Sequence, residues 1–179
     1  MREAASYIMD EVKEALNGVD QETFDAFVDA LISAKKIFIY GVGRSGLVGK
    51  AFSVRLVQMG LATYFIGDTT TPIVESGDVV IIISNTGETM SAVQTANIVG
   101  RLGSKVVLIT GAGHSKLGSA SSIIVELKLR KDEQKSRFAP LGTLFEAAAY
   151  FFLDSTVPVM MERLQQTEAS MRRRHAIWV

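Results

Sequence analysis

Residues 37–46 read IFIYGVGRSG, a short apolar run followed by a glycine-rich turn. Four consecutive apolar residues ended by a glycine are typical of a strand that is buried on both faces of a parallel sheet. The turn leads into a segment over residues 45–59 whose apolar positions predict a helix. A strand followed closely by a helix is the building unit of α/β proteins.

The same alternation continues along the chain. Further strands are expected over residues 63–66, 79–83, 106–110 and 123–127. Further helices are expected over residues 90–102 and 142–164, the second with Pro158 as a point where it can kink, and Thr167 is the expected N-cap of the tail. The pattern predicts an α/β fold with a five-stranded parallel sheet and helices on both faces, of the flavodoxin-like or Rossmann-like class.

One domain accounts for all 179 residues, of which 47% are hydrophobic. Amphipathic helices are expected over 1–34, the β/α core over 35–128, and the closing helices and tail over 140–179. Six of the eight residues at 130–137 are charged, so this segment is expected to be a solvated loop.

Composition removes several classes of function. Lys and Arg together number 19, as do Asp and Glu, so the chain has no polyanion footprint and nucleic acid is not an expected partner. Cysteine is absent and there are only two histidines without ligand spacing, so no metal site is expected. The N-terminus lacks the pattern of a signal peptide, and no uninterrupted apolar run reaches about 18 residues. We therefore expect a cytoplasmic protein with no membrane contact.

A loop rich in hydroxyl groups follows the strand expected at 79–83. It reads Ser84-Asn85-Thr86-Gly87-Glu88-Thr89 and stands immediately before a helix. The first amides and the dipole of a helix attract phosphate, glycine lets the backbone approach it, and hydroxyls complete its shell. The loop predicts a phosphate site, and the alternative is that Thr86 merely caps the helix.

The glycine-rich turn after the first strand has three interpretations. It matches the G-x-G-x-x-G pattern of dinucleotide-binding proteins, with Asp68 about 20 residues after Gly46. It could equally be a tight turn, or contact a sugar phosphate. Dinucleotide binding leaves the second loop unexplained, so we favour sugar-phosphate contact. Ser45 is then expected to bond a sugar hydroxyl, and Arg44 to face either the phosphate or a neighbouring carboxylate.

Two residues are candidates for moving protons. Glu146 lies in an otherwise apolar segment, where desolvation makes a carboxylate a stronger base, although a favourable contact with the helix dipole is the simpler alternative. His175 follows three arginines and could exchange protons near neutral pH, or be an ordinary surface residue. His114 lies in a glycine-rich turn and is expected to be structural.

The segment at 83–89 resembles the phosphate loop of SIS (sugar isomerase) domains, which carry a Ser-x-Ser-Gly-x-Thr pattern; here Thr86 stands where serine is usual. Further matching segments lie at residues 43–48, 69–72, 140–146 and 174–176. Together they span nearly the whole chain and most resemble the SIS proteins that interconvert 3-hexulose 6-phosphate and fructose 6-phosphate. The last three residues, 177–179, are less polar than the usual ending.

The resemblance implies a homotetrameric phosphosugar isomerase of the ribulose monophosphate pathway of formaldehyde metabolism, without metal or other cofactor. It implies that Glu146 is the base and that His175, supplied by a neighbouring subunit, assists proton transfer through a cis-enediol. The implied substrate-binding residues are Arg44, Ser45, Ser84, Asn85, Thr86, Gly87 and Thr89. Two alternatives stay open: another aldose–ketose phosphate isomerase of the same family, and a sugar-phosphate sensor without catalysis.

Overall fold

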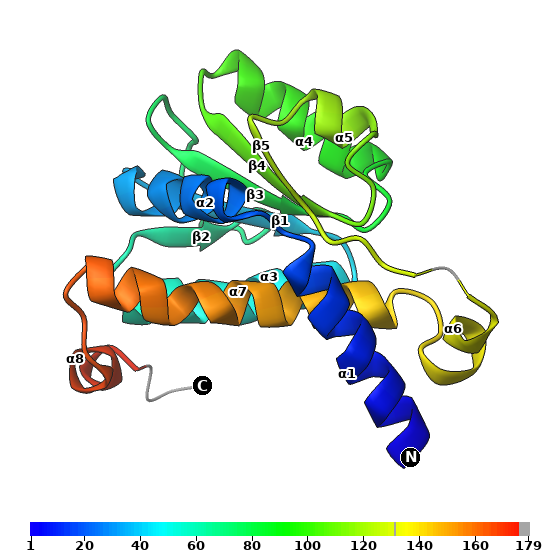
Figure 1. Cartoon of the computed structure of the whole chain (residues 1–179). Coiled ribbons are helices and arrows are strands. Elements are labelled where there is room, and N and C mark those ends of the chain that lie inside the picture. Colours follow the sequence, from blue (N-terminus) through cyan, green and yellow to red (C-terminus); the bar gives the residue numbers. More distant parts are fainter. Residues whose placement is uncertain (131, 176–179) are drawn as a thin grey trace.

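Five parallel strands form the centre of the computed structural model, which describes residues 1–130 and 132–175 (Figure 1). The strands are β1 (Ile37–Gly41), β2 (Thr63–Phe65), β3 (Val79–Ile83), β4 (Lys105–Thr110) and β5 (Ile123–Glu126). Their order across the sheet is β2-β1-β3-β4-β5, and Ile39 in β1 aligns with Phe65 on one side and Ile81 on the other. The predicted five-stranded parallel sheet is confirmed.

Helices cover both faces of this sheet, as the alternation of strands and helices predicts (Figure 1). The helices are α1 (Arg2–Asn17), α2 (Gln21–Ser33), α3 (Arg44–Gln58), α4 (Met90–Arg101), α5 (Lys116–Ser119), α6 (Glu133–Phe138), α7 (Thr143–Arg163) and α8 (Glu168–Arg173). Helices α1, α2, α3 and α7 share one apolar core with the sheet, and α4 and α5 share the other. Each strand serves both cores: Ile37 and Ile39 belong to the first, while Phe38 between them belongs to the second. This alternation explains why the strand sequences are mainly apolar, with polar residues such as Lys105 and Glu126 at the strand ends.

Helix α7 is the central helix of the larger core. Phe145, Phe152 and Met160 are each at most 2% exposed, and the 21-residue helix continues through Pro158. By length and composition alone it qualifies as a candidate membrane span, with 44% of its most apolar window buried inside the protein. It packs against α1, α2 and α3, and its buried side chains belong to the apolar core that these helices share with the sheet, as expected for a core helix.

The charged segment at 130–137 is not the loop that its composition predicts, because residues 133–138 form the short helix α6. Asp132 caps this helix: its carboxylate accepts a hydrogen bond of 2.9 Å from the amide of Lys135. Phe138 packs its ring 5.7 Å from that of Tyr7 on α1. A cap and one aromatic contact outweigh the charge density, so the prediction of a loop is wrong here.

Helix α8 begins as the sequence predicts. Thr167 and Ser170 form a capping box in which each side chain bonds the other residue's amide, at 3.1 and 3.0 Å. The cap holds α8 against the end of α3, where Arg174 bonds the carbonyl of Gln58 at 3.1 Å.

The order of the strands marks where a ligand is expected. From β1 the chain crosses to β2 on one side and then returns to place β3 on the other side. In open parallel sheets, ligands bind at the carboxyl ends of the strands beside such a reversal. The loops that follow β1 and β3 are the two loops that the sequence singles out, and they flank this point.

Candidate functional site

The loop after β3 leaves the start of α4 open. The N-cap of α4 is Thr89 rather than Thr86, and its side chain makes no capping hydrogen bond. Its hydroxyl instead lies 3.4 Å from that of Ser84, which is only 5% exposed, while Thr86 accepts a 3.3 Å bond from the amide of Glu88. The alternative interpretation, in which Thr86 caps the helix, is therefore wrong. The first amides of α4 and these two hydroxyls point to an anion site.

The shape of the loop is held by close packing against the ends of neighbouring elements. Gly87 has a φ of 66°, and a Cβ there would lie 2.0 Å from the hydroxyl oxygen of Ser115, so only glycine fits. The carbonyl of Asn85 accepts a 3.0 Å bond from the amide of Gly111, just beyond β4. The loop is therefore a fixed surface on which a ligand can be oriented.

Glu88 has a structural role, because its carboxylate contacts Lys116 twice. Its carboxylate lies 2.9 Å from the ammonium of Lys116 and accepts the amide of the same residue at 3.0 Å. The hydrogen bond lowers the pKa of the Glu88 carboxyl and raises the pKa of the Lys116 ammonium. Lys116, which contacts the loop, is thus already paired with a carboxylate.

Across the reversal point, the loop after β1 meets the start of α7. Arg44, at the first turn of α3, hydrogen-bonds and ion-pairs with Glu146. The Glu146 side chain is 13% exposed, whereas that of Arg44 is 70% exposed. The sequence offered Arg44 either a phosphate or a neighbouring carboxylate as its partner, and in the structure Arg44 pairs with the carboxylate of Glu146. Ser45 follows on the same turn and is half-buried.

The glycines of this first loop have a packing role. A Cβ at Gly46 would lie 2.4 Å from the carbonyl oxygen of Gly41, so the start of α3 sits directly against the end of β1. Asp68, which the dinucleotide interpretation needs for a ribose, lies 3.3 Å from the ammonium of Lys50. Nearby, Thr71 donates to the carbonyl of Asp68 at 2.7 Å, so the threonine run forms a turn.

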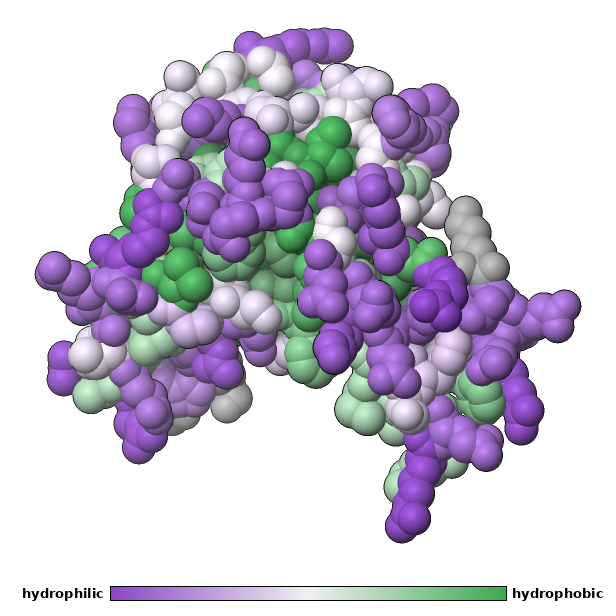
Figure 2. Space-filling model, in the orientation of Figure 1, coloured by the Kyte–Doolittle hydropathy of each residue, from purple (hydrophilic) through white to green (hydrophobic). Residues whose placement is uncertain are grey.

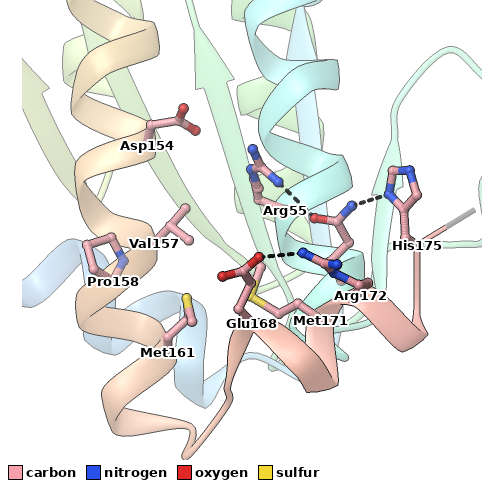
Figure 3. Close-up of a pocket in the computed structure, with 10 residues that line it drawn as sticks. Arg55, Asp154, Val157, Pro158, Met161, Glu168, Met171, Arg172 and His175 are labelled. Atoms are coloured by element: carbon pink, nitrogen blue, oxygen red, sulfur yellow. Dashed lines mark hydrogen bonds and ion pairs between the residues drawn. The ribbon is translucent and has the colours of Figure 1, made fainter.

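His175 lies at the far end of α3 from Glu146. Its Nδ1 atom is 2.9 Å from the amide nitrogen of Gln58, the last residue of α3, at the rim of a pocket between α3, α7 and α8 (Figure 3). At 1.5 Å per residue, Arg44 and Gln58 are about 21 Å apart along the helix. One chain therefore does not bring the two candidate proton-transfer residues together. No sequence signal identifies Gln58 as a partner of His175, because 117 positions separate them.

The remaining histidine, His114, is exposed in the turn after β4. Within residues 1–130 and 132–175, no three His, Cys, Asp or Glu side chains gather closely enough to hold a metal ion.

A helix start lined by hydroxyl groups therefore lies on one side of the sheet's reversal point, and the largely buried carboxylate of Glu146 lies on the other. The chain belongs to the SIS domain family, whose sequence profile matches residues 30–149.

Its relatives include proteins named 3-hexulose-6-phosphate isomerase. The one from Methanocaldococcus jannaschii is 37% identical over 151 residues, which cover 84% of this chain and 81% of its own. The one from Bacillus subtilis is 32% identical over 178 residues, with 97% and 96% covered. A crystal structure from Methanococcus jannaschii, described as inferring that same function, superposes with a TM-score of 0.85 at 32% identity over 96% of this chain and 98% of its own. The family and these relatives support a phosphosugar isomerase.

Proposed function

We propose that this chain interconverts 3-hexulose 6-phosphate and fructose 6-phosphate in the cytoplasm. The observation that carries the proposal is Glu146, a carboxylate only 13% exposed that faces the loop after β1 at the edge of the sheet where the phosphate loop also lies. The relatives named for this reaction match over most of both chains, which supports the choice of substrate.

The chemistry needs one base and one proton donor. Moving the carbonyl between C3 and C2 requires a proton to leave one of these carbons and another to return to its neighbour, through an enediol. An ionised Glu146 accepts the first proton, and a positioned group of this kind contributes about 10²–10⁴-fold to the rate. The pair with Arg44 holds the carboxylate in a fixed orientation. The hydroxyls of Ser84, Thr86 and Thr89, the amides of Asn85 and Gly87, and Ser45 on the opposite loop are proposed to hold the substrate.

His175 is proposed to act in the site of a second copy. Glu146 lies beside one end of α3 and His175 beside the other, and these two helix ends are about 21 Å apart. If two copies pack with their α3 helices antiparallel about a two-fold axis, the His175 end of one lies beside the Glu146 end of the other. Both sites are then completed by the same contact, as an isologous interface requires.

The surface between these two ends is suited to such a contact. Leu47 and Val54 on α3 are 66% and 50% exposed, and Phe151 on α7 is 56% exposed. Figure 2 shows the lower edge of the molecule hollowed between the part that carries α8 and the part that carries α1 and α6. Apolar side chains along paired helices support a second copy as the occupant, and a tetramer as a pair of such dimers.

The proposed reaction is tested by supplying 3-hexulose 6-phosphate, made from formaldehyde and ribulose 5-phosphate by a hexulose-phosphate synthase, to the purified protein. Fructose 6-phosphate is detected through phosphoglucose isomerase and an NADP-linked dehydrogenase. Turnover by the purified protein supports the proposal. Binding of the sugar phosphate without turnover would instead favour a sensor.

Ser84→Ala is expected to raise KM for the sugar phosphate by about 10- to 100-fold, because a hydrogen bond to a charged group contributes about 1.5–3 kcal/mol. The value of kcat should change little, since Ser84 is assigned to the phosphate and not to the reacting carbons. Ser33→Ala is the matched control: its hydroxyl bonds the carbonyl of Asp29 at the end of α2, away from the site. An unchanged KM in Ser84→Ala would remove the loop from the binding site.

A further inference from the structure

A pocket of about 760 Å³ is lined both by the phosphate loop and by the charged segment before α7. Asn85 and Gly111, just after β3 and β4, line it. Arg130 and Lys135 of the charged segment line it as well. The segment that the sequence marks only by its charge density therefore borders the space next to the proposed phosphate site.

The cations around the phosphate loop differ in what already neutralises them. Arg44 is paired with Glu146, and Lys116 is paired with Glu88. Arg130 lies 3.4 Å from Glu11, a carboxylate whose side chain is 6% exposed.

Lys135 is the exception. Its ammonium donates to the carbonyl of Leu141 at 2.9 Å, and among the residues that the structure describes no carboxylate lies within 4.0 Å of it. A neutral carbonyl holds the ammonium in place but leaves its charge uncompensated.

Asp132, the acidic residue that lines the same pocket, bonds groups other than the Lys135 ammonium. Asp132 accepts both the hydroxyl of Tyr7 and the amide of Lys135 through Oδ1, each at 2.9 Å. Burial and this hydrogen bond raise the pKa of Tyr7 to about 12, so the phenol remains a donor throughout the neutral range. Asp132 is thus tied to α1 and to the start of α6.

The position of Lys135 is set by the rest of the fold. Helix α6 rests on α1 through the Tyr7–Phe138 ring contact, and Glu11 of α1 also accepts the backbone amide of Arg130 at 3.3 Å. Beyond α6, Leu141 is 90% exposed and has a φ of 57°, an unfavourable backbone conformation for a branched residue. Its carbonyl is a partner that the ammonium can exchange for a stronger acceptor.

We propose that Lys135 is a phosphate-binding residue: its ammonium exchanges the Leu141 carbonyl for a phosphate oxygen of the sugar phosphate held by the loop after β3. The proposal rests on the proposed function, because it takes a phosphorylated sugar as the ligand. It supplies the positive charge that the phosphate loop itself lacks, since residues 84–89 contain no basic side chain. A charge-assisted bond of this kind is stronger than one between neutral groups.

The test measures binding of fructose 6-phosphate, of inorganic phosphate and of unphosphorylated fructose by calorimetry, and KM and kcat in the isomerase assay. Lys135→Gln removes the charge but keeps a donor that can bond the Leu141 carbonyl. Lys135→Arg keeps the charge. Lys105→Ala is the matched control, because it removes an exposed lysine at the amino end of β4, the opposite edge of the sheet.

Lys135→Gln is expected to weaken binding of fructose 6-phosphate by about 10- to 100-fold and to raise KM, with kcat changed far less. Lys135→Arg should recover most of the affinity, and Lys105→Ala should match wild type. Lys135→Gln could bind fructose 6-phosphate as tightly as wild type while the wild-type protein isomerises it. Lys135 would then have only a structural role, so the inference would fail and the proposed function would stand. If wild-type protein binds neither the ester nor phosphate, both proposals fail.

Discussion

Glu146→Gln is expected to lower kcat by about 10²- to 10⁴-fold while the affinity for fructose 6-phosphate stays within a few-fold of wild type. The amide has the shape of the carboxylate and can still bond Arg44, so the site keeps its form. It cannot accept the proton from carbon, so only the chemical step is lost. Single-turnover kinetics and calorimetric binding separate the two effects.

The control for this substitution lies on the same helix. Glu162→Gln removes an exposed carboxylate near the far end of α7 and is expected to leave kcat unchanged. Near-normal turnover by Glu146→Gln, in protein whose circular dichroism matches wild type, would contradict the role of Glu146 as base. The carboxylate would then be the structural partner of Arg44 and no more.

Two inactive variants are expected to restore each other when mixed. If His175 completes the site of a second copy, a dimer of one Glu146→Gln chain and one His175→Ala chain contains one site with both wild-type residues. Random pairing of equal amounts then recovers about a quarter of the wild-type activity per chain. The measurement is turnover after the two variants are unfolded and refolded together.

In the control, the Glu146→Gln chain is mixed with a chain that carries both substitutions instead of with His175→Ala. No site in this mixture contains both wild-type residues, so it should stay inactive. Recovery only in the first mixture supports a shared site. No recovery, from chains that reassemble to the wild-type size, would place the function of His175 within its own chain. A fully active His175→Ala variant would return the residue to an ordinary surface role.

The sheet was predictable because its strands are mainly apolar runs with polar residues such as Lys105 and Glu126 only at their ends. Burial on both faces demands that pattern. The position of the loop at 84–89 was also predictable, because these hydroxyls and the glycine stand between an apolar strand and a helix. Its role in binding phosphate stays a prediction. For Arg44 the sequence predicted either a phosphate or a neighbouring carboxylate as the partner. It could not decide between them, because it shows which residues are charged but not how far apart they lie.

Other features depend on contacts between distant parts of the chain. Helix α6 was missed because its stability comes from Asp132 as a cap and from Tyr7, more than 120 residues earlier. The position of His175 beside Gln58 has no local signature either. Charge density describes the solvent-facing side of such a segment and carries no information about the neighbour on which its other side rests.

The central claim is that the carbonyl moves between C3 and C2, and solvent exchange tests it most directly. Fructose 6-phosphate is incubated with the protein in D₂O, and the position of deuterium is read by NMR while the formation of 3-hexulose 6-phosphate is followed. The proposed reaction predicts deuterium at C3, because that is the carbon from which Glu146 removes a proton. Deuterium at C1 would show an aldose–ketose isomerase instead. The absence of both exchange and product would contradict catalysis and leave a sugar-phosphate sensor.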